Sequence, residues 1–180
     1  MHRNSSESFG FYEDNFIGSN IQINIPEAGE AESWPDFYLN KRILFQYKLA
    51  EKNGYSTDEL KNVIHRIESK IHDILKGSEE PPALLHGDLW SGNYIVDESG
   101  TACLIDPAVY YGHREADLAM TRLFGGFSQE FYESYMDTFP LPDNHKEREN
   151  IYKLYHALNH LNLFGNGYYN TSLALAKTYL

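Results

Sequence analysis

The sequence contains a single cysteine, Cys103, among 180 residues. One cysteine cannot form a disulfide within the chain, and a zinc site built on cysteine needs more than one thiolate. An internal disulfide framework and a cysteine-based zinc site are therefore excluded. Because Cys103 lies in the apolar run 102–105, we expect it to be an unreactive thiol in the core.

Long hydrophobic runs are also missing. No stretch approaches the roughly 20 apolar residues of a membrane-spanning helix. The polar start at residues 1–6 is followed by no apolar segment of the kind found in secretory signals. These absences predict a soluble, cytoplasmic protein without a membrane partner.

Positive charge is scarce. Fifteen Lys and Arg residues face 26 Asp and Glu residues, which gives a formal net charge of −11. Nucleic acids and anionic membranes are bound through basic surfaces, so neither is expected as a main partner. A nucleotide ligand would need cations to help hold its phosphates.

The composition that remains is globular, with 42% hydrophobic and 14% aromatic residues. We expect a disordered start at residues 1–8 and one domain over 9–180. Alternating apolar residues predict a strand or extended loop at 21–25, and Ser56 with Glu59 predicts a capping box. Helical spacing of apolar residues predicts helices over about 33–50, 57–76, 115–124, 128–138, 145–164 and 170–179.

The strongest motif is HGDLWSGN at 86–93, which is followed by Asp106. Residues 94–96 and 102–105 flank the turn-forming stretch 97–100, a pattern that predicts a β-hairpin. The hairpin would bring Asn93 at its entrance close to Asp106 at its exit, with Asp88 just before it. This is the layout of a kinase catalytic loop, in which Asp88 accepts the hydroxyl proton while Asn93 and Asp106 hold Mg²⁺.

His86 and Gly87 refine this interpretation. We interpret His86 mainly as a structural residue that fixes the loop, with proton transfer as the weaker alternative, and also place it on the cofactor side of the site. Protein kinases have an arginine at the position of Gly87, which can pair with a phosphorylated activation loop. The glycine therefore favours phosphorylation of small molecules over a phosphorylation-controlled protein kinase.

A second patch covers residues 110–120. Glu115 and Asp117 fall in the first turn of a predicted helix, where negative charge suits the helix dipole. For Asp117 we favour a buried carboxylate that bonds back to the backbone of the catalytic loop. Trp90, Tyr110 and Glu115 are candidates for the substrate pocket, although aromatic residues at this density also suit a core.

Four further histidines raise the question of a metal site. His156 and His160 are four residues apart, but no glutamate follows His156, so the HExxH zinc motif is absent. We interpret both, together with His113 and His145, as helix-face or core residues.

The chain resembles the fructosamine kinase (ketosamine-3-kinase) family, which is related to the aminoglycoside phosphotransferases and has a protein-kinase-like fold. The resemblance covers residues 9–180. It implies ATP and Mg²⁺ as cofactors and a ketosamine, or glycated amine, as substrate, with phosphorylation of a sugar hydroxyl. It also implies Asp88 as catalytic base and Asn93 and Asp106 as metal ligands. The stretches that carry it are HGDLWSGN (86–93), IDPAVYYGHREADLAM (105–120), LFGGF (123–127), YKLYHALNHLNLFGNGYY (152–169) and FGFYEDNFIGSNIQIN (9–24).

The chain departs from that family at its front. Family members carry an amino-terminal lobe with a nucleotide-covering loop and a phosphate-binding lysine, whereas this sequence contains neither GxGxxG nor GxxxxGK. We therefore expect a mainly α-helical carboxy-terminal lobe with one small hairpin, whose partner would be a missing amino-terminal lobe. Such a chain would be weakly active or inactive alone. The alternatives are another small-molecule kinase of the aminoglycoside or choline type, and a non-catalytic fragment that binds sugar amines.

Overall fold

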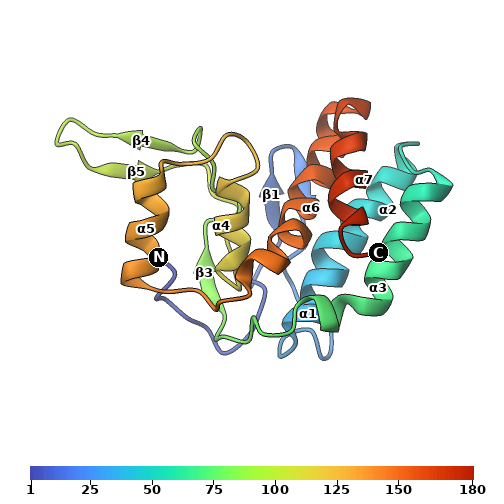
Figure 1. Ribbon diagram of the computed structural model, residues 1–180, viewed down its shortest axis with the longest axis horizontal. Helices are drawn as coiled ribbons and strands as arrows, with labels where there is room; N and C mark the ends of the chain where they lie inside the picture. Colours follow the sequence, from blue (N-terminus) through green and yellow to red (C-terminus); the bar gives the residue numbers. More distant parts are fainter.

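The computed structural model describes all residues from 1 to 180, and its helices fall into two groups (Figure 1). On one side lie α1 (Trp34–Tyr38), α2 (Phe45–Lys52), α3 (Asp58–Ile74) and α7 (Tyr169–Lys177). On the other side lie α4 (Glu115–Thr121) and α5 (Gln129–Thr138). The long helix α6 (His145–Phe164) runs between the two groups and contacts both α4 and α7.

The first helical stretch begins where the sequence predicts. The Ser33 hydroxyl accepts a hydrogen bond from the backbone N–H of Asp36 and forms the N-cap, and Pro35 occupies the first turn. The stretch then continues without a break through a π-helical segment, η1 (Leu39–Leu44), into α2. Propensity and periodicity do not reveal a π-helical segment, so this feature was not predicted.

Helix α3 confirms the predicted helix, but its cap is different. Thr57, rather than Ser56, accepts the hydrogen bond from the Leu60 N–H. Ser56 instead bonds to the Tyr47 hydroxyl, and Glu59 pairs with Lys177. The predicted Ser56–Glu59 capping box is therefore wrong, because tertiary contacts engage both of its residues.

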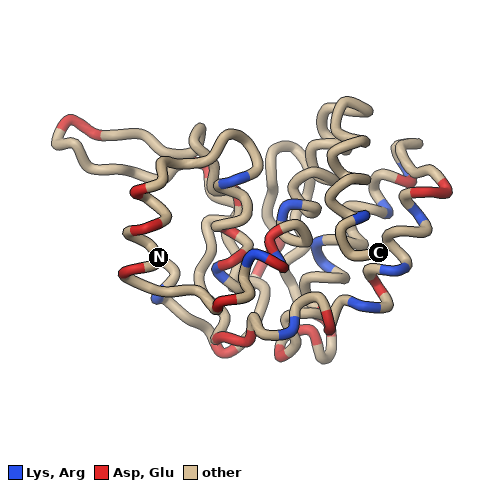
Figure 2. Tube along the Cα trace, in the orientation of Figure 1, with Lys and Arg blue, Asp and Glu red and all other residues tan.

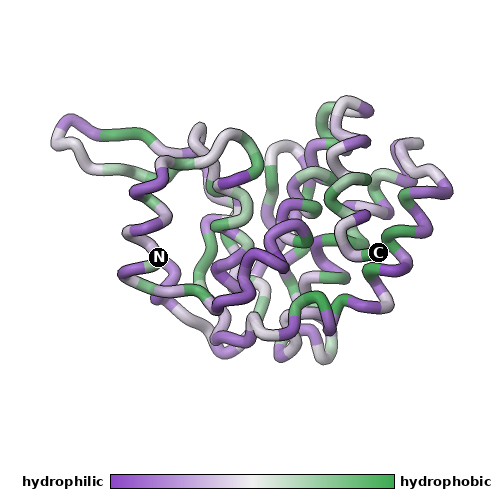
Figure 3. The backbone as a smooth tube through the Cα atoms, viewed as in Figure 1, coloured by the Kyte–Doolittle hydropathy of each residue, from purple (hydrophilic) through white to green (hydrophobic).

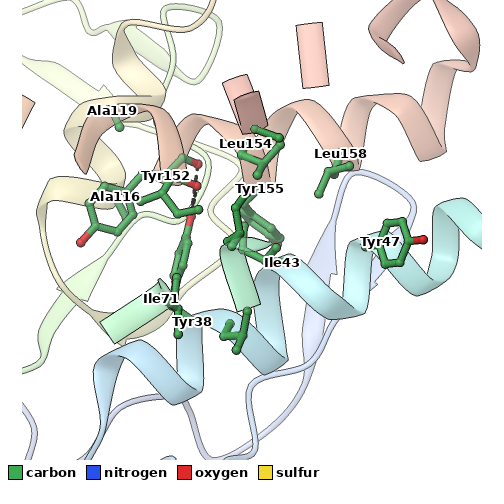
Figure 4. Packing of buried hydrophobic residues seen from close by; sticks show 14 of the residues in the cluster. Tyr38, Ile43, Tyr47, Ile71, Ala116, Ala119, Tyr152, Leu154, Tyr155 and Leu158 are labelled. Carbon is green, nitrogen blue, oxygen red and sulfur yellow. Dashed lines mark hydrogen bonds between the residues drawn. The ribbon is translucent and has the colours of Figure 1, made fainter. Parts of the chain in front are cut away.

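The apolar stripe of α3 packs into one core that is shared by α1, α2, α6 and α7. Figure 4 shows its aromatic centre, where the Tyr38 hydroxyl donates to the backbone carbonyl of Tyr152 at 3.2 Å. Such a bond satisfies a buried hydroxyl that would otherwise oppose folding. The fully buried members on α3 and α6 include Leu60, Ile64, Ile67, Ile151, Leu154, Leu158 and Leu161.

Three two-stranded antiparallel sheets complete the fold. The predicted hairpin is confirmed as β4 (Tyr94–Val96) and β5 (Ala102–Leu104). Strand β3 (Ala83–Leu85) pairs with β6 (Tyr110–Gly112), and β1 (Asn15–Ile17) pairs with β2 (Asn20–Gln22). The fold is thus mixed α+β, with more strand pairing than the single hairpin that the sequence predicts. The β3–β6 pair was missed because its paired residues lie 25 to 29 positions apart along the chain.

The first eight residues are not frayed, which corrects the expected disordered start. The Leu84 N–H donates to the Asn4 carbonyl at 2.8 Å, and the Ser6 N–H donates to the Pro82 carbonyl at 3.0 Å. These bonds lay the start of the chain along the free edge of β3. Polar composition predicted disorder here, but an unpaired strand edge binds any backbone whatever its side chains.

The β4–β5 hairpin projects away from the rest of the molecule (Figure 1). Hydrophobic residues follow both of its strands in Figure 3, and acidic residues occupy its tip in Figure 2. Every strand residue is exposed except Cys103, which is half-buried. The expectation of a core thiol is therefore wrong, since this apolar run lies in a projecting ribbon. No helix of the protein has the length and apolar character needed to cross a membrane.

Candidate active site

The candidate site begins where β3 ends and the chain turns into the loop 86–93. Gly87 has a φ of +82°, and a Cβ at this position would lie 1.9 Å from the Ala108 carbonyl oxygen. The Ala108 N–H in turn donates to the His86 carbonyl at 2.8 Å. A side chain at residue 87 would therefore break the contact between the loop and the segment after the hairpin. This backbone requirement explains the glycine independently of any preference for substrate.

The Asp117 side chain of α4 is hydrogen-bonded to the backbone at the start of the loop. Its carboxylate accepts the backbone N–H groups of His86 at 2.7 Å and Gly87 at 2.8 Å. The bond back to the loop that the sequence predicts is thus present. The His2 imidazole also donates to this carboxylate, at 2.9 Å, a contact that was missed because residues 1–8 were expected to be disordered.

His86 is buried, and both of its ring nitrogens have partners. Nε2 donates to the Ile105 carbonyl at 3.0 Å, and Nδ1 accepts the Asp88 N–H at 3.3 Å. The ring therefore connects the loop to the exit of the hairpin, in agreement with the structural interpretation. Neither nitrogen is free to bind a nucleotide, so the placement of His86 on the cofactor side is wrong.

Asp88 and Asn93 are in direct contact. The Asn93 side-chain amide donates to the Asp88 carbonyl at 2.9 Å and to its carboxylate at 3.2 Å. Burial raises the pKa of Asp88 to about 6; the bond from Asn93 opposes this rise, and the charges of Asp106 and Asp117 add to it. The raised pKa indicates a carboxylate that is short of positive partners.

Asp106 is the only non-glycine residue with a left-handed backbone, at a φ of 52°. Aspartate tolerates this region better than most residues, and such conformations gather at functional sites. The Ile105 N–H donates to the Asn93 carbonyl at 3.0 Å, so Asp106 follows directly after the closing pair of the hairpin. Asp106 is exposed, and its charge helps to raise the pKa of Asp88.

The three predicted substrate residues lie in different environments. Trp90 is partly exposed at the rim of the loop, and its ring covers the backbone of Gly92, where a Cβ would come within 2.3 Å of the indole. Tyr110 is buried in the core, with the Arg42 guanidinium 4.0 Å from its ring centroid. Glu115 is buried in an ion pair with Arg148. Tyr110 is thus placed in the core rather than in a pocket, and the Glu115 carboxylate, although it borders a cavity between α4, α5 and α6, is already paired with Arg148.

The remaining groups form a set of oxygen ligands. The Asn93 amide nitrogen is engaged with Asp88, which leaves its carbonyl oxygen directed elsewhere, and Asp106 presents an exposed carboxylate. Carboxylate and amide oxygens are the ligands that Mg²⁺ prefers, and they bind it while it keeps several waters. The donor set therefore suits Mg²⁺, which would keep waters in its remaining positions, since no group of three or more His, Cys, Asp or Glu side chains gathers anywhere in the protein.

Comparisons with known proteins give one family for the whole chain. The family model described as fructosamine kinase matches residues 1–180. A chloroplastic protein-ribulosamine 3-kinase from Oryza sativa is 40% identical over all of this chain and 52% of its own length. A probable ketoamine kinase from Enterococcus faecium is also 40% identical, over 93% of this chain and 59% of its own length.

Solved structures give the same result. A crystal structure assigned to the fructosamine-3-kinases, from Thermobifida fusca, superposes with a TM-score of 0.84 at 36% identity. It covers 97% of this chain and 59% of its own. The chain thus spans about half of the length of the curated relatives that it matches.

Proposed function

Because the chain belongs to the fructosamine kinase family, we propose that it carries the catalytic loop of an ATP-dependent kinase that phosphorylates a sugar hydroxyl of ketosamines. The observation that carries this proposal is the contact between Asp88 and Asn93 beside Asp106, on a loop whose backbone is held by Asp117. Phosphoryl transfer depends mainly on such positioning and on electrostatic stabilisation.

In this proposal Asp88 orients the sugar hydroxyl and accepts its proton. A pKa of about 6 leaves the carboxylate ionised at neutral pH, yet close enough to neutrality to be an effective base. The hydrogen bond from Asn93 fixes the carboxylate in one orientation. The partly exposed Trp90 would form one wall of the substrate pocket.

Asn93 and Asp106 would hold Mg²⁺, through the amide oxygen and the carboxylate. When bound, the ion neutralises charge on the ATP phosphates. The left-handed backbone at Asp106 and the bond of the neighbouring Ile105 N–H to the Asn93 carbonyl support this pairing of ligands. These residues alone supply no positive charge for the phosphates, which agrees with the overall charge of −11.

We further propose that the 180 residues correspond to the carboxy-terminal lobe of a protein-kinase-like fold. The order of a catalytic loop, a short hairpin and a helix with a buried aspartate supports this assignment. The relatives are nearly twice as long, and the chain holds neither GxGxxG nor GxxxxGK. We therefore expect little turnover from these residues alone, because stabilisation of the transferred phosphoryl group would be incomplete.

The test is Mg-ATP-dependent phosphorylation of a ribulosamine and a fructosamine, with an aminoglycoside and choline as comparison substrates. Asp88→Asn should lower kcat by about 10²- to 10⁴-fold wherever turnover is measurable. The matched control is Asp137→Asn, an exposed carboxylate on α5, which should leave kcat unchanged. Near-normal activity of Asp88→Asn would remove Asp88 from the role of base, and preference for an aminoglycoside or choline would change the substrate class.

Metal binding can be tested without turnover. Titration of Mg²⁺ should shift the side-chain amide resonance of Asn93, and Asp106→Asn should weaken that response by about tenfold or more. Asp97→Asn, at the tip of the same hairpin, is the control. An equal response in wild type and Asp106→Asn would contradict the proposed ligand set.

A further inference from the structure

His2 occupies a position that its place near the start of the chain does not suggest. Its Nε2 donates to the Asp117 carboxylate at 2.9 Å, and its Nδ1 is hydrogen-bonded to the Tyr135 hydroxyl at 2.7 Å. The His2 and Asp117 side chains are 8% and 1% exposed. A histidine with both nitrogens bonded and almost no contact with solvent is fixed in one orientation.

Asp117 depends on this contact. Burial by itself would raise the pKa of Asp117, but the bond and charge of His2, together with the amides of His86 and Gly87, hold that pKa below its ordinary value. His2 and the His86 amide donate to the same oxygen, Oδ2, whereas the Gly87 amide donates to Oδ1. His2 is therefore the only side chain among the three donors. Without it, a buried carboxylate would keep two backbone donors, and its negative charge would be less well balanced.

Strand pairing attaches the segment that follows His2 to the strand that precedes the loop. Residues 4–6 pair with the edge of β3, and β3 leads directly into His86. His2 and the catalytic loop are thus attached to the same short ribbon. Tyr135 of α5, the second partner of His2, also accepts a hydrogen bond of 3.4 Å from the Arg114 guanidinium at the start of α4. His2 is therefore linked through Tyr135 to both helices.

We propose that His2 is a positioning residue of the active site: its imidazole completes the donors that hold Asp117, and Asp117 fixes the backbone of His86 and Gly87 that presents Asp88. The consequence for catalysis rests on the proposed function, whereas the effect on the loop does not. The site is therefore assembled from three separate parts of the chain, namely residues 1–6, the loop 86–93 and helix α4.

The proposal is tested by amide hydrogen exchange, followed by NMR, in the 180-residue chain. His2→Phe keeps a flat ring but removes the donor, and it should speed the exchange of the His86 and Gly87 amides by about tenfold or more relative to the Ile67 amide of α3. His2→Gln retains an N–H donor and should restore part of the protection. His65→Phe, on an exposed face of α3, should change neither rate. Should His2→Phe not fold, His2→Ala is measured in the same way.

Any of three results would overturn the proposal. Unchanged exchange at His86 and Gly87 would show that the loop does not need His2. An equal acceleration at Ile67 would show a general loss of stability instead of a local effect. Failure of His2→Gln to restore any protection would show that a donor at residue 2 is not what holds the loop.

Exchange requires neither ATP nor ketosamine, so this outcome is independent of the proposed function. Where turnover is measurable, His2→Phe should lower kcat at least fivefold while KM for the ketosamine stays within twofold, and His2→Gln should recover part of kcat. A rise in KM at unchanged kcat would place His2 in substrate binding and contradict the positioning role. Failure of the inference would leave the effect of Asp88→Asn intact.

Discussion

The loop after β3 and the hairpin that follows it lie in opposite environments. In the loop, His86 and Gly87 are buried and bonded to Asp117. In the hairpin, Ile95 and Val96 of β4 are 52% and 60% exposed. The loop is fixed by the core, while the hairpin is held mainly by the pairing of its own two strands. The residues that determine stability are thus separate from the projecting ribbon, which is flanked by the proposed ligands Asn93 and Asp106.

The largest expected loss of stability comes from breaking the buried ion pair between α4 and α6. Glu115 forms two short bonds to Arg148, at 2.8 and 2.6 Å, and both side chains are almost fully buried. Glu115→Ala should lower the free energy of unfolding by about 3–5 kcal/mol, because it leaves the Arg148 cation buried without a counter-charge. Urea unfolding measures the loss. The double variant Glu115→Leu with Arg148→Met should regain most of the lost free energy of unfolding, because it leaves no charge buried. A loss below about 1 kcal/mol for Glu115→Ala would contradict this role of the pair.

Isoleucine occurs in both the core and the hairpin, so the same substitution can be compared in the two regions. Ile67 on α3 is fully buried, whereas Ile95 on β4 is half exposed. Ile67→Ala should cost about 2–5 kcal/mol because it leaves a cavity, while Ile95→Ala should cost no more than about 0.5 kcal/mol. Both are measured by urea unfolding under the same conditions. Equal losses would show that the hairpin shares the cooperative unit of the core.

Two buried histidines should make the folded protein less stable in acid. Burial lowers the pKa of His156 to about 3, and burial likewise lowers that of His113 to about 3. Between pH 6.5 and pH 3 the unfolded chain binds protons that these folded rings do not, so stability should fall as the pH falls through this window. Each ring contributes a slope of up to about 1.4 kcal/mol per pH unit.

Replacement of one ring tests this slope. His156→Leu should reduce the pH dependence of the urea midpoint between pH 4 and 6 by about one proton, whereas His65→Leu, at an exposed site, should leave it unchanged. An unaltered slope in His156→Leu would show that His156 is protonated in the folded protein.

The smallest effect is expected on the surface. Lys177 of α7 pairs with Glu59 of α3 at 2.5 Å, and both side chains are about half exposed. Lys177→Ala should cost only about 0.2–1 kcal/mol, and less at high salt, because solvent screens the pair. Urea unfolding at low and high salt checks both statements. A loss comparable with that of Glu115→Ala would remove the distinction between buried and exposed pairs.

Local signals were enough to predict much of the fold. Helix α6 and the β4–β5 hairpin occupy the predicted residues, because periodicity and turn residues act over short separations. The spacing of Asp88, Asn93 and Asp106 likewise follows from a hairpin that the sequence indicates. Errors occurred where distant partners decide the result, as in the pairing of residues 4–6 with β3 and the cap at Thr57.

Residue types at short, fixed spacings were enough to predict the loop 86–93, the hairpin and the family resemblance. Which polar residues reach the candidate site depends on the tertiary structure. Tyr110 and Glu115, close to the motif in sequence, are withdrawn into the core by Arg42 and Arg148. His2, more than 80 residues from the loop, is brought to it by strand pairing and by a buried carboxylate that requires a donor. Burial and the balance of charge act through space, and no local pattern records them.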